Sequence, residues 1–157
     1  MSDSFVFQLL NKKYKKLFDL IKKCPENKRE VVPEGFKNSI HWQIGHILYS
    51  TENHVIRLSD QNKVLPENYQ TFFGYGTKPL DWKEVVPKWD KLIEQLKEQL
   101  VYIHDTCSDK LDTPVKENFI KANTIGELLI YNISHVSEHI GVIISMIKVL
   151  NDFKSPN

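Results

Sequence analysis

The chain has 157 residues, of which 26% are charged and 41% hydrophobic, a composition typical of one folded globular domain rather than of a disordered chain. Lys and Arg total 21 against 20 Asp and Glu, so the chain lacks the strong positive field of a nucleic-acid-binding protein. Cys24 and Cys107 form no C-x-x-C pair, which excludes a disulfide scaffold and favours free thiols in the cytoplasm. We therefore expect a single domain over residues 1–157 with no nucleic-acid partner.

The sequence predicts neither a secretory leader nor a membrane span. Its N-terminal residues lack a basic stretch followed by an apolar core and a small-residue cleavage site. The most apolar late run, Gly141 to Ile147, is interrupted at Lys148 and is shorter than the roughly 20 residues that cross a bilayer. A cytoplasmic protein with no membrane partner is therefore expected.

Apolar residues at helical spacing predict the first two helices. The first covers residues 4–23 and ends just before a proline. After a polar connector, the second begins at Asn38 or Ser39, either of which can act as the N-cap, and continues to about Ser59. An irregular segment follows over residues 60–80, where prolines and a Gly-Tyr-Gly turn interrupt the pattern.

Two further helices complete the predicted fold. The third is expected over residues 82–104, with Pro87 either kinking it or marking its true first turn. The fourth begins at Thr124, which forms a capping box with Glu127, and continues to Leu150. Because no segment alternates as a strand would, the sequence predicts an all-α four-helix bundle.

Two histidines lie in the middle of the apolar stripe of the fourth helix. His135 and His139 are four residues apart, so their Cβ atoms are about 5–6 Å apart on one face. One interior histidine is usually a hydrogen-bonded core residue, but two need partners for four ring nitrogens, and a shared metal ion supplies one for each. The pair therefore favours metal ligation. Asn132, one turn earlier, is a candidate to orient a ligand or substrate, or to bond a neighbouring helix.

The local string His135-Val-Ser-Glu-His139 also matches H-x-x-E-H, one of the zinc-peptidase signatures. Such peptidases take a carboxylate ligand well downstream, and no Glu follows Glu138. A di-iron carboxylate bundle is excluded as well, because no Glu in the chain has a His three residues later. A third ligand must therefore come from another helix.

Two histidines of the second helix are candidates for that ligand. His46 shares a stripe with Trp42, Tyr49 and Asn53, whereas His54 lies nearer the edge of the apolar side. Periodicity alone does not choose between the two histidines. The other three residues of the stripe are candidates to line a substrate pocket, although packing between helices explains them equally well.

Two segments resemble the DinB-like (damage-inducible) family. The first is Asn38-Ser-Ile-His-Trp-Gln-Ile-Gly-His-Ile-Leu48, similar to the family's second helix, where a histidine before an aliphatic residue ligates a metal ion. The other runs from Thr124-Ile-Gly-Glu-Leu-Leu129 to the late histidines and Gly141, similar to a last helix that ends H-x-x-x-H-x-G. The chain has Ile-Gly-Val at 140–142 where many relatives have Arg-Gly-Gln, so any role of that glutamine is absent.

The resemblance implies one divalent metal ion held by His46, His135 and His139, with zinc or nickel expected first and manganese or iron as alternatives. Three protein ligands with an open position are typical of catalytic rather than structural metal sites. The loop at residues 72–76 either closes over such a site as a lid or covers the open end of the bundle.

DinB-like proteins are similar to the bacillithiol and mycothiol S-transferases. The resemblance thus implies a metal-dependent thiol S-transferase, a homodimer, that activates a low-molecular-weight thiol such as bacillithiol, or water. The alternatives are a non-catalytic, stress-associated metal-binding bundle and a small metallohydrolase.

Overall fold

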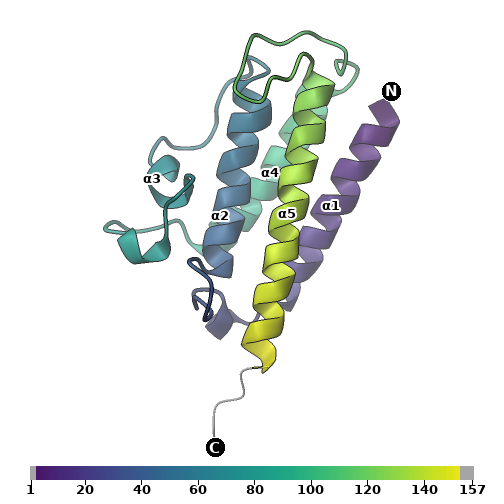
Figure 1. Cartoon of the computed structure of the whole chain (residues 1–157). Coiled ribbons are helices and arrows are strands. Elements are labelled where there is room, and N and C mark those ends of the chain that lie inside the picture. The colour runs from purple at the N-terminus through teal and green to yellow at the C-terminus, as the bar shows by residue number, and fades with distance from the viewer. Residues whose placement is uncertain (1–2, 153–157) are drawn as a thin grey trace, which may run out of the picture.

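Four long helices lie side by side in the computed structural model, which describes residues 3–152 (Figure 1). Residues 1–2 and 153–157 of the expected domain lie outside that part. The helices are α1 (Asp3–Lys23), α2 (Ile40–Thr51), α4 (Trp89–Cys107) and α5 (Ile125–Asp152). Within residues 3–152 there is no strand, only an isolated bridge between Pro114 and Thr124. The predicted all-α four-helix bundle is confirmed.

The core forms where the apolar stripes of these helices meet. α1 packs against α5, and α2 packs against both α4 and α5. Tyr14 of α1 is fully buried, and its hydroxyl lies 3.3 Å from the Thr51 hydroxyl of α2. Burial of such large side chains supplies most of the stabilisation, at about 1.5–3 kcal/mol for each. α2 lies between two neighbours, so its residues are buried on nearly every side.

α2 begins at one of its two candidate caps and ends in an unpredicted way. Ser39 is the N-cap residue, because its hydroxyl accepts a hydrogen bond from the Trp42 amide at 3.1 Å. After Thr51 the helix continues as a π-helix, Glu52–Arg57. The Glu52 carboxylate is buried and accepts the backbone amides of residues 64 and 65 at 2.6 and 2.8 Å. π-helical turns are rare and frequently lie at functional sites.

The expected start of the third helix was wrong by seven residues. α4 begins at Trp89, and Trp82 follows a short 3-10 turn, Pro79–Asp81. Pro87 lies just before the N-cap Lys88 rather than inside a kinked helix or in its first turn. A proline disfavours the helical conformation of the residue before it, so the segment ahead of Pro87 stays extended.

The segment 60–80 is also more ordered than the sequence indicated. It contains a short helix, α3 (Tyr69–Phe73), which lies against α2. A Cβ atom at Gly45 of α2 would overlap the Phe73 ring, so the glycine allows this close approach. The packing brings the C-terminal end of α3 to the middle of α2.

The start of α5 agrees closely with the predicted capping box. The Thr124 hydroxyl accepts the Glu127 amide at 3.3 Å, while the Glu127 carboxylate accepts the Asn123 amide at 2.6 Å. The carboxylate therefore reaches one residue further back than in the standard box.

By length and composition alone, α5 also passes the test for a membrane-crossing helix over Ile125–Asn151, with a mean hydropathy of 1.3. A core helix of a soluble bundle passes the same test, so this is weak evidence for a span.

Candidate metal centre

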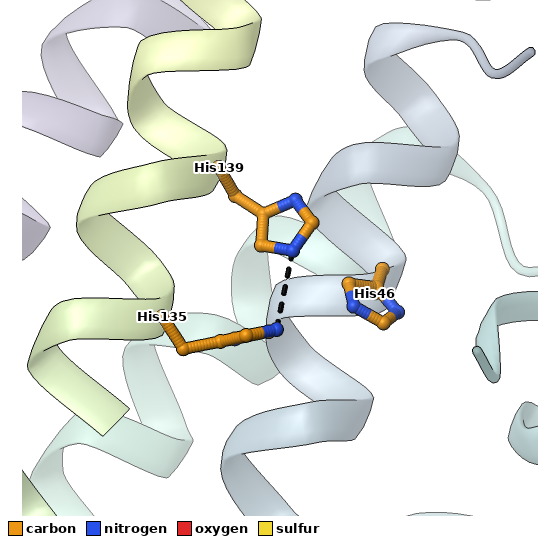
Figure 2. Close-up of side chains that lie close together, drawn as sticks. All are labelled: His46, His135 and His139. Carbon is orange, nitrogen blue, oxygen red and sulfur yellow. Dashed lines mark hydrogen bonds between the residues drawn. The ribbon is translucent and has the colours of Figure 1, made fainter. Parts of the chain in front are cut away.

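Three histidines from two neighbouring helices converge between α2 and α5 (Figure 2). His46 lies on α2, and His135 and His139 lie one turn apart on α5. One ring nitrogen from each histidine lies within 4.8 Å of the other two. The Nε2 atoms of His135 and His139 are 3.2 Å apart. These residues, named here the histidine cluster, are the three that the family resemblance implied as ligands.

Two rings of the histidine cluster are oriented by hydrogen bonds on their outer nitrogens. Nδ1 of His46 donates to the Phe73 carbonyl at 2.7 Å, and Nδ1 of His139 donates to the Gln43 side-chain oxygen at 2.6 Å. Because each acceptor is an oxygen without a proton, Nδ1 carries the hydrogen in both rings. Nε2 is then unprotonated and has its lone pair available, which is the usual preparation of a metal-ligating histidine.

The cluster also contains one buried nitrogen atom that the described residues leave without a partner. Nδ1 of His135 is buried and makes no hydrogen bond within the described residues. The Ser50 hydroxyl lies within hydrogen-bond distance of Nε2 of His46, at 3.2 Å. Three imidazole nitrogens that converge within 4.8 Å suit a divalent ion such as zinc, nickel or iron, so the residues present fit a metal ion.

Burial keeps the metal-free histidine cluster neutral. Together with the charges of neighbouring histidines, burial lowers the pKa of His135 from 6.5 to about 3 and that of His139 to about 4. It also lowers the pKa of His46, although the bond to the Phe73 carbonyl acts in the opposite direction. Since only neutral imidazole offers a lone pair, these shifts favour metal binding at neutral pH.

His54, the alternative third ligand, lies beside the cluster rather than in it. Its ring meets the His135 ring edge to face with centroids 4.9 Å apart, and burial lowers its pKa to about 4. Its Nδ1 is buried without a hydrogen-bond partner in the described residues. No nitrogen of His54 joins the group of three within 4.8 Å. The geometry therefore favours His46 over His54 as the third ligand.

A cavity of about 1400 Å³ opens onto the histidine cluster. Trp42, Tyr49 and Asn53, the candidate substrate-binding residues of α2 and its π-helical extension, all line it. The Trp42 ring stacks on His46 with centroids 4.6 Å apart and planes 9° apart, and its indole N–H donates to the Thr77 hydroxyl at 3.0 Å. Substrate contact by these residues stays a prediction.

Asn132, the fourth candidate, lies elsewhere. It is fully buried and is not among the residues that line the cavity. Its amide lies beside Tyr14 and His54, without a hydrogen bond of standard geometry in the described residues. Its position suits a packing or orienting role better than direct contact with a ligand in the cavity.

The aromatic loop at 72–76 divides into two parts. Phe72 and Phe73 are buried in the core, as expected of residues that cover the bundle. Tyr75 is 98% exposed and lines the cavity together with Gly74 and Gly76. The loop thus both seals the core and forms part of the cavity wall.

Sequence reasoning missed the groups that hold the cluster from outside. Gln43 lies three residues before His46 and therefore on the same helical face, a spacing that could have indicated it. Ser50, four residues after His46, carries the same signal. No sequence signal indicates the Phe73 carbonyl, because every residue has a backbone oxygen and α3 was not predicted.

Comparison with known proteins supports the fold and the family. No curated protein matches the chain. A crystal structure of a conserved protein from Enterococcus faecalis is similar, with a TM-score of 0.67 at 13% identity over 95% of this chain and 96% of that one. At that identity the likeness shows the fold alone. A family model described as DinB superfamily matches residues 9–143. The chain belongs to the DinB superfamily.

Proposed function

We propose that this protein is a metal-dependent thiol S-transferase that joins a low-molecular-weight thiol to an electrophile. The observation that carries the proposal is the histidine cluster itself: three imidazoles, each with a ring nitrogen within 4.8 Å of the other two, beside a large cavity. Three histidine ligands leave at least one coordination position for another group. They contribute no negative charge to offset that of a divalent ion, so an anionic sulfur is a suitable occupant.

The cavity has room for two reactants. Its volume of about 1400 Å³ exceeds the roughly 300–1000 Å³ of ordinary small-molecule sites. When bound, a divalent ion would supply the positive charge that lowers the pKa of a thiol. Transfer forms a carbon–sulfur bond, breaks the bond to the leaving group, and releases the thiol proton to solvent. A chain with two buried free cysteines fits a reducing, cytoplasmic setting.

The residues around the cluster have separate tasks in this proposal. Gln43 and the Phe73 carbonyl hold two rings in the orientation that a ligand needs. Trp42 covers one face of His46 and keeps water from it. Tyr49 and Asn53 offer polar groups to substrates in the cavity. Proximity of two bound reactants is the main source of rate acceleration in such a site.

Turnover of an electrophile by purified, metal-loaded protein tests the proposal. Bacillithiol and 1-chloro-2,4-dinitrobenzene are incubated with the zinc and nickel forms, and the thioether and chloride are quantified. We expect formation that depends on the thiol, the metal and His139, with a His139→Ala variant as the inactive control. Conversion without thiol would instead indicate a metallohydrolase. Stoichiometric metal binding with no turnover of any electrophile would indicate a non-catalytic metal-binding bundle.

A further inference from the structure

The cavity beside the histidine cluster carries a strong local excess of positive charge. Four basic side chains line it against one acidic side chain, Glu138. The chain as a whole is nearly neutral, with 21 basic and 20 acidic residues. The four basic residues are named here the cationic rim: Lys37, Arg57, Lys63 and Lys78.

The cationic rim is assembled by the fold and not by a run of lysines in the sequence. Lys37 precedes α2, Arg57 ends the π-helix, Lys63 lies in the following loop, and Lys78 follows α3. Among the described residues, none of the four forms an ion pair, whereas Lys15, Lys91 and Lys116 elsewhere do. Their charges are therefore not neutralised within the chain.

Burial places the cationic rim at the outer end of the cavity. Lys37, Arg57 and Lys63 are exposed and Lys78 is half-buried, whereas His46 is only 6% exposed. The basic groups thus lie where the cavity meets solvent, and the histidine cluster lies deeper. A cleft lined by one sign of charge concentrates ligands of the opposite sign, more strongly at low ionic strength.

We infer that the ligand of this cavity is a thiol that carries at least two negatively charged groups, carboxylate or phosphate, away from its sulfur. The inference rests on the proposed function in one respect, namely that the sulfur end reaches the histidine cluster. The cationic rim then binds the acidic groups and determines which thiols are accepted. Aromatic walls such as Trp42 and Tyr49 enclose the part of the ligand between the two ends.

The size of the effect follows from the exposure of the rim. A single ion pair in contact with water contributes about 0.2–1 kcal/mol, which corresponds to roughly a 1.5- to 5-fold change in affinity. Several such pairs act together on a ligand with two charges. A dianionic thiol is therefore expected to bind about ten-fold or more tightly than a neutral thiol of the same length.

Two thiols and four substitutions test the inference on cobalt-loaded protein. Binding of N-(3-mercaptopropanoyl)aspartate, a dianion whose two carboxylates are ionised at neutral pH, and of its neutral diamide is followed by the sulfur-to-cobalt absorption band. Arg57→Gln and Lys78→Gln are expected to weaken binding of the dianion about two- to five-fold and to leave binding of the neutral thiol unchanged. Glu138→Gln is expected to strengthen binding of the dianion about two-fold. Lys16→Gln, on the exposed face of α1 outside the cavity, is the matched control.

A second measurement needs no metal and no thiol. The polysulfonated dye pyranine is titrated into metal-free protein, and its fluorescence anisotropy is followed with the same variants. Binding that weakens in Arg57→Gln and Lys78→Gln, and at higher salt, supports the cationic rim. Competition by succinate would identify carboxylates and competition by glycerol phosphate would identify phosphates as the recognised groups.

The outcomes separate the inference from the proposed function. Equal affinity for the dianionic and neutral thiols, with no response to the rim substitutions, would overturn the inference while leaving thiol binding intact. Absence of the sulfur-to-cobalt band for both thiols would count against the proposed function. In that case the pyranine titration alone tests the inference. Pyranine binding that does not change with the rim substitutions would overturn the inference.

Discussion

His41 and His46 lie five residues apart on α2, and the surroundings of the two differ in one decisive respect. Both are buried, with 4% and 6% of their surfaces exposed, and burial lowers the pKa of both. The ring of His41 faces other groups than histidines: Nε2 donates to the Pro87 carbonyl at 2.9 Å, and Nδ1 lies 3.5 Å from the Glu30 carboxylate. His46 instead has a ring nitrogen within 4.8 Å of ring nitrogens of His135 and His139, and the Ser50 hydroxyl is the protein group beside its Nε2.

The comparison teaches that neither burial nor a lowered pKa identifies a metal ligand in this bundle. The distinguishing property is a ring nitrogen that lies close to ring nitrogens of two other histidines. His41 joins α2 to the segment before α4 and is a structural histidine, whereas His46 belongs to the site.

The largest effect is expected from removing each of the two histidines in turn. His46→Ala should weaken zinc binding by more than about a hundred-fold, because a direct ligand matters at least as much as the groups that orient it. His41→Ala should retain one equivalent of zinc but lose about 1–3 kcal/mol of unfolding free energy, because the buried Pro87 carbonyl loses its donor. Metal content by mass spectrometry and thermal unfolding give the two readouts. Loss of zinc from His41→Ala would contradict the comparison.

A smaller effect is expected from the residue that orients His139. Gln43→Leu removes the acceptor of the Nδ1 hydrogen and should weaken zinc binding about 10- to 100-fold. Gln43→Glu retains an acceptor and should restore most of the affinity. Gln99→Leu is the matched control, since Gln99 is equally buried but donates to the Leu48 carbonyl away from the cluster. Competition with a chromophoric chelator measures each affinity, and an unchanged value for Gln43→Leu would contradict the orienting role.

Acid should destabilise the metal-free protein. The unfolded chain takes up protons on these histidines near pH 6.5, whereas in the folded chain burial lowers the pKa of His135 to about 3 and of His139 to about 4. Between these values the unfolded state binds more protons, so stability falls as the pH falls from about 6.5 towards 4. After allowance for partial exposure, a decrease in Tm of about 5–10 °C is expected between pH 7 and pH 5. Thermal unfolding of wild type and His135→Gln checks this, since the variant should lose part of the dependence.

The smallest effect is expected at His54, which contacts His135 but lies outside the histidine cluster. His54→Gln should retain one equivalent of zinc, with an affinity within about three-fold of wild type, as expected when no direct ligand is removed. Metal analysis beside His46→Ala provides the measurement. Loss of zinc from His54→Gln but not from His46→Ala would exchange the roles of the two residues.

The parts of this molecule that sequence predicted are those governed by local periodicity and capping. The bundle, the start of α2 at Asn38 or Ser39 and the start of α5 follow from apolar spacing and side-chain caps. The pairing of His135 with His139 follows equally from their spacing of four residues.

What sequence could not predict depends on contacts between distant segments. α3 has only five residues and exists because Phe73 packs over Gly45. The carbonyl that orients His46 comes from that helix and leaves no mark in the pattern. Helical periodicity also could not choose between His46 and His54, because a wheel of constant pitch fails beyond Thr51, where the helix widens.

The widened turn at Glu52–Arg57 has a consequence for how the second helix can change over generations. A π-helical turn bonds each residue to the fifth along instead of the fourth, so it holds one residue more than the α-helical turn it replaces. With the extra residue, the Glu52 carboxylate accepts hydrogen bonds from the following loop while the His54 ring lies against that of His135. Deletion of a single residue here would restore the regular α-helical pitch, and either Glu52 or His54 would then point away from its present contact. This segment should therefore tolerate substitutions more readily than the insertion or deletion of a residue.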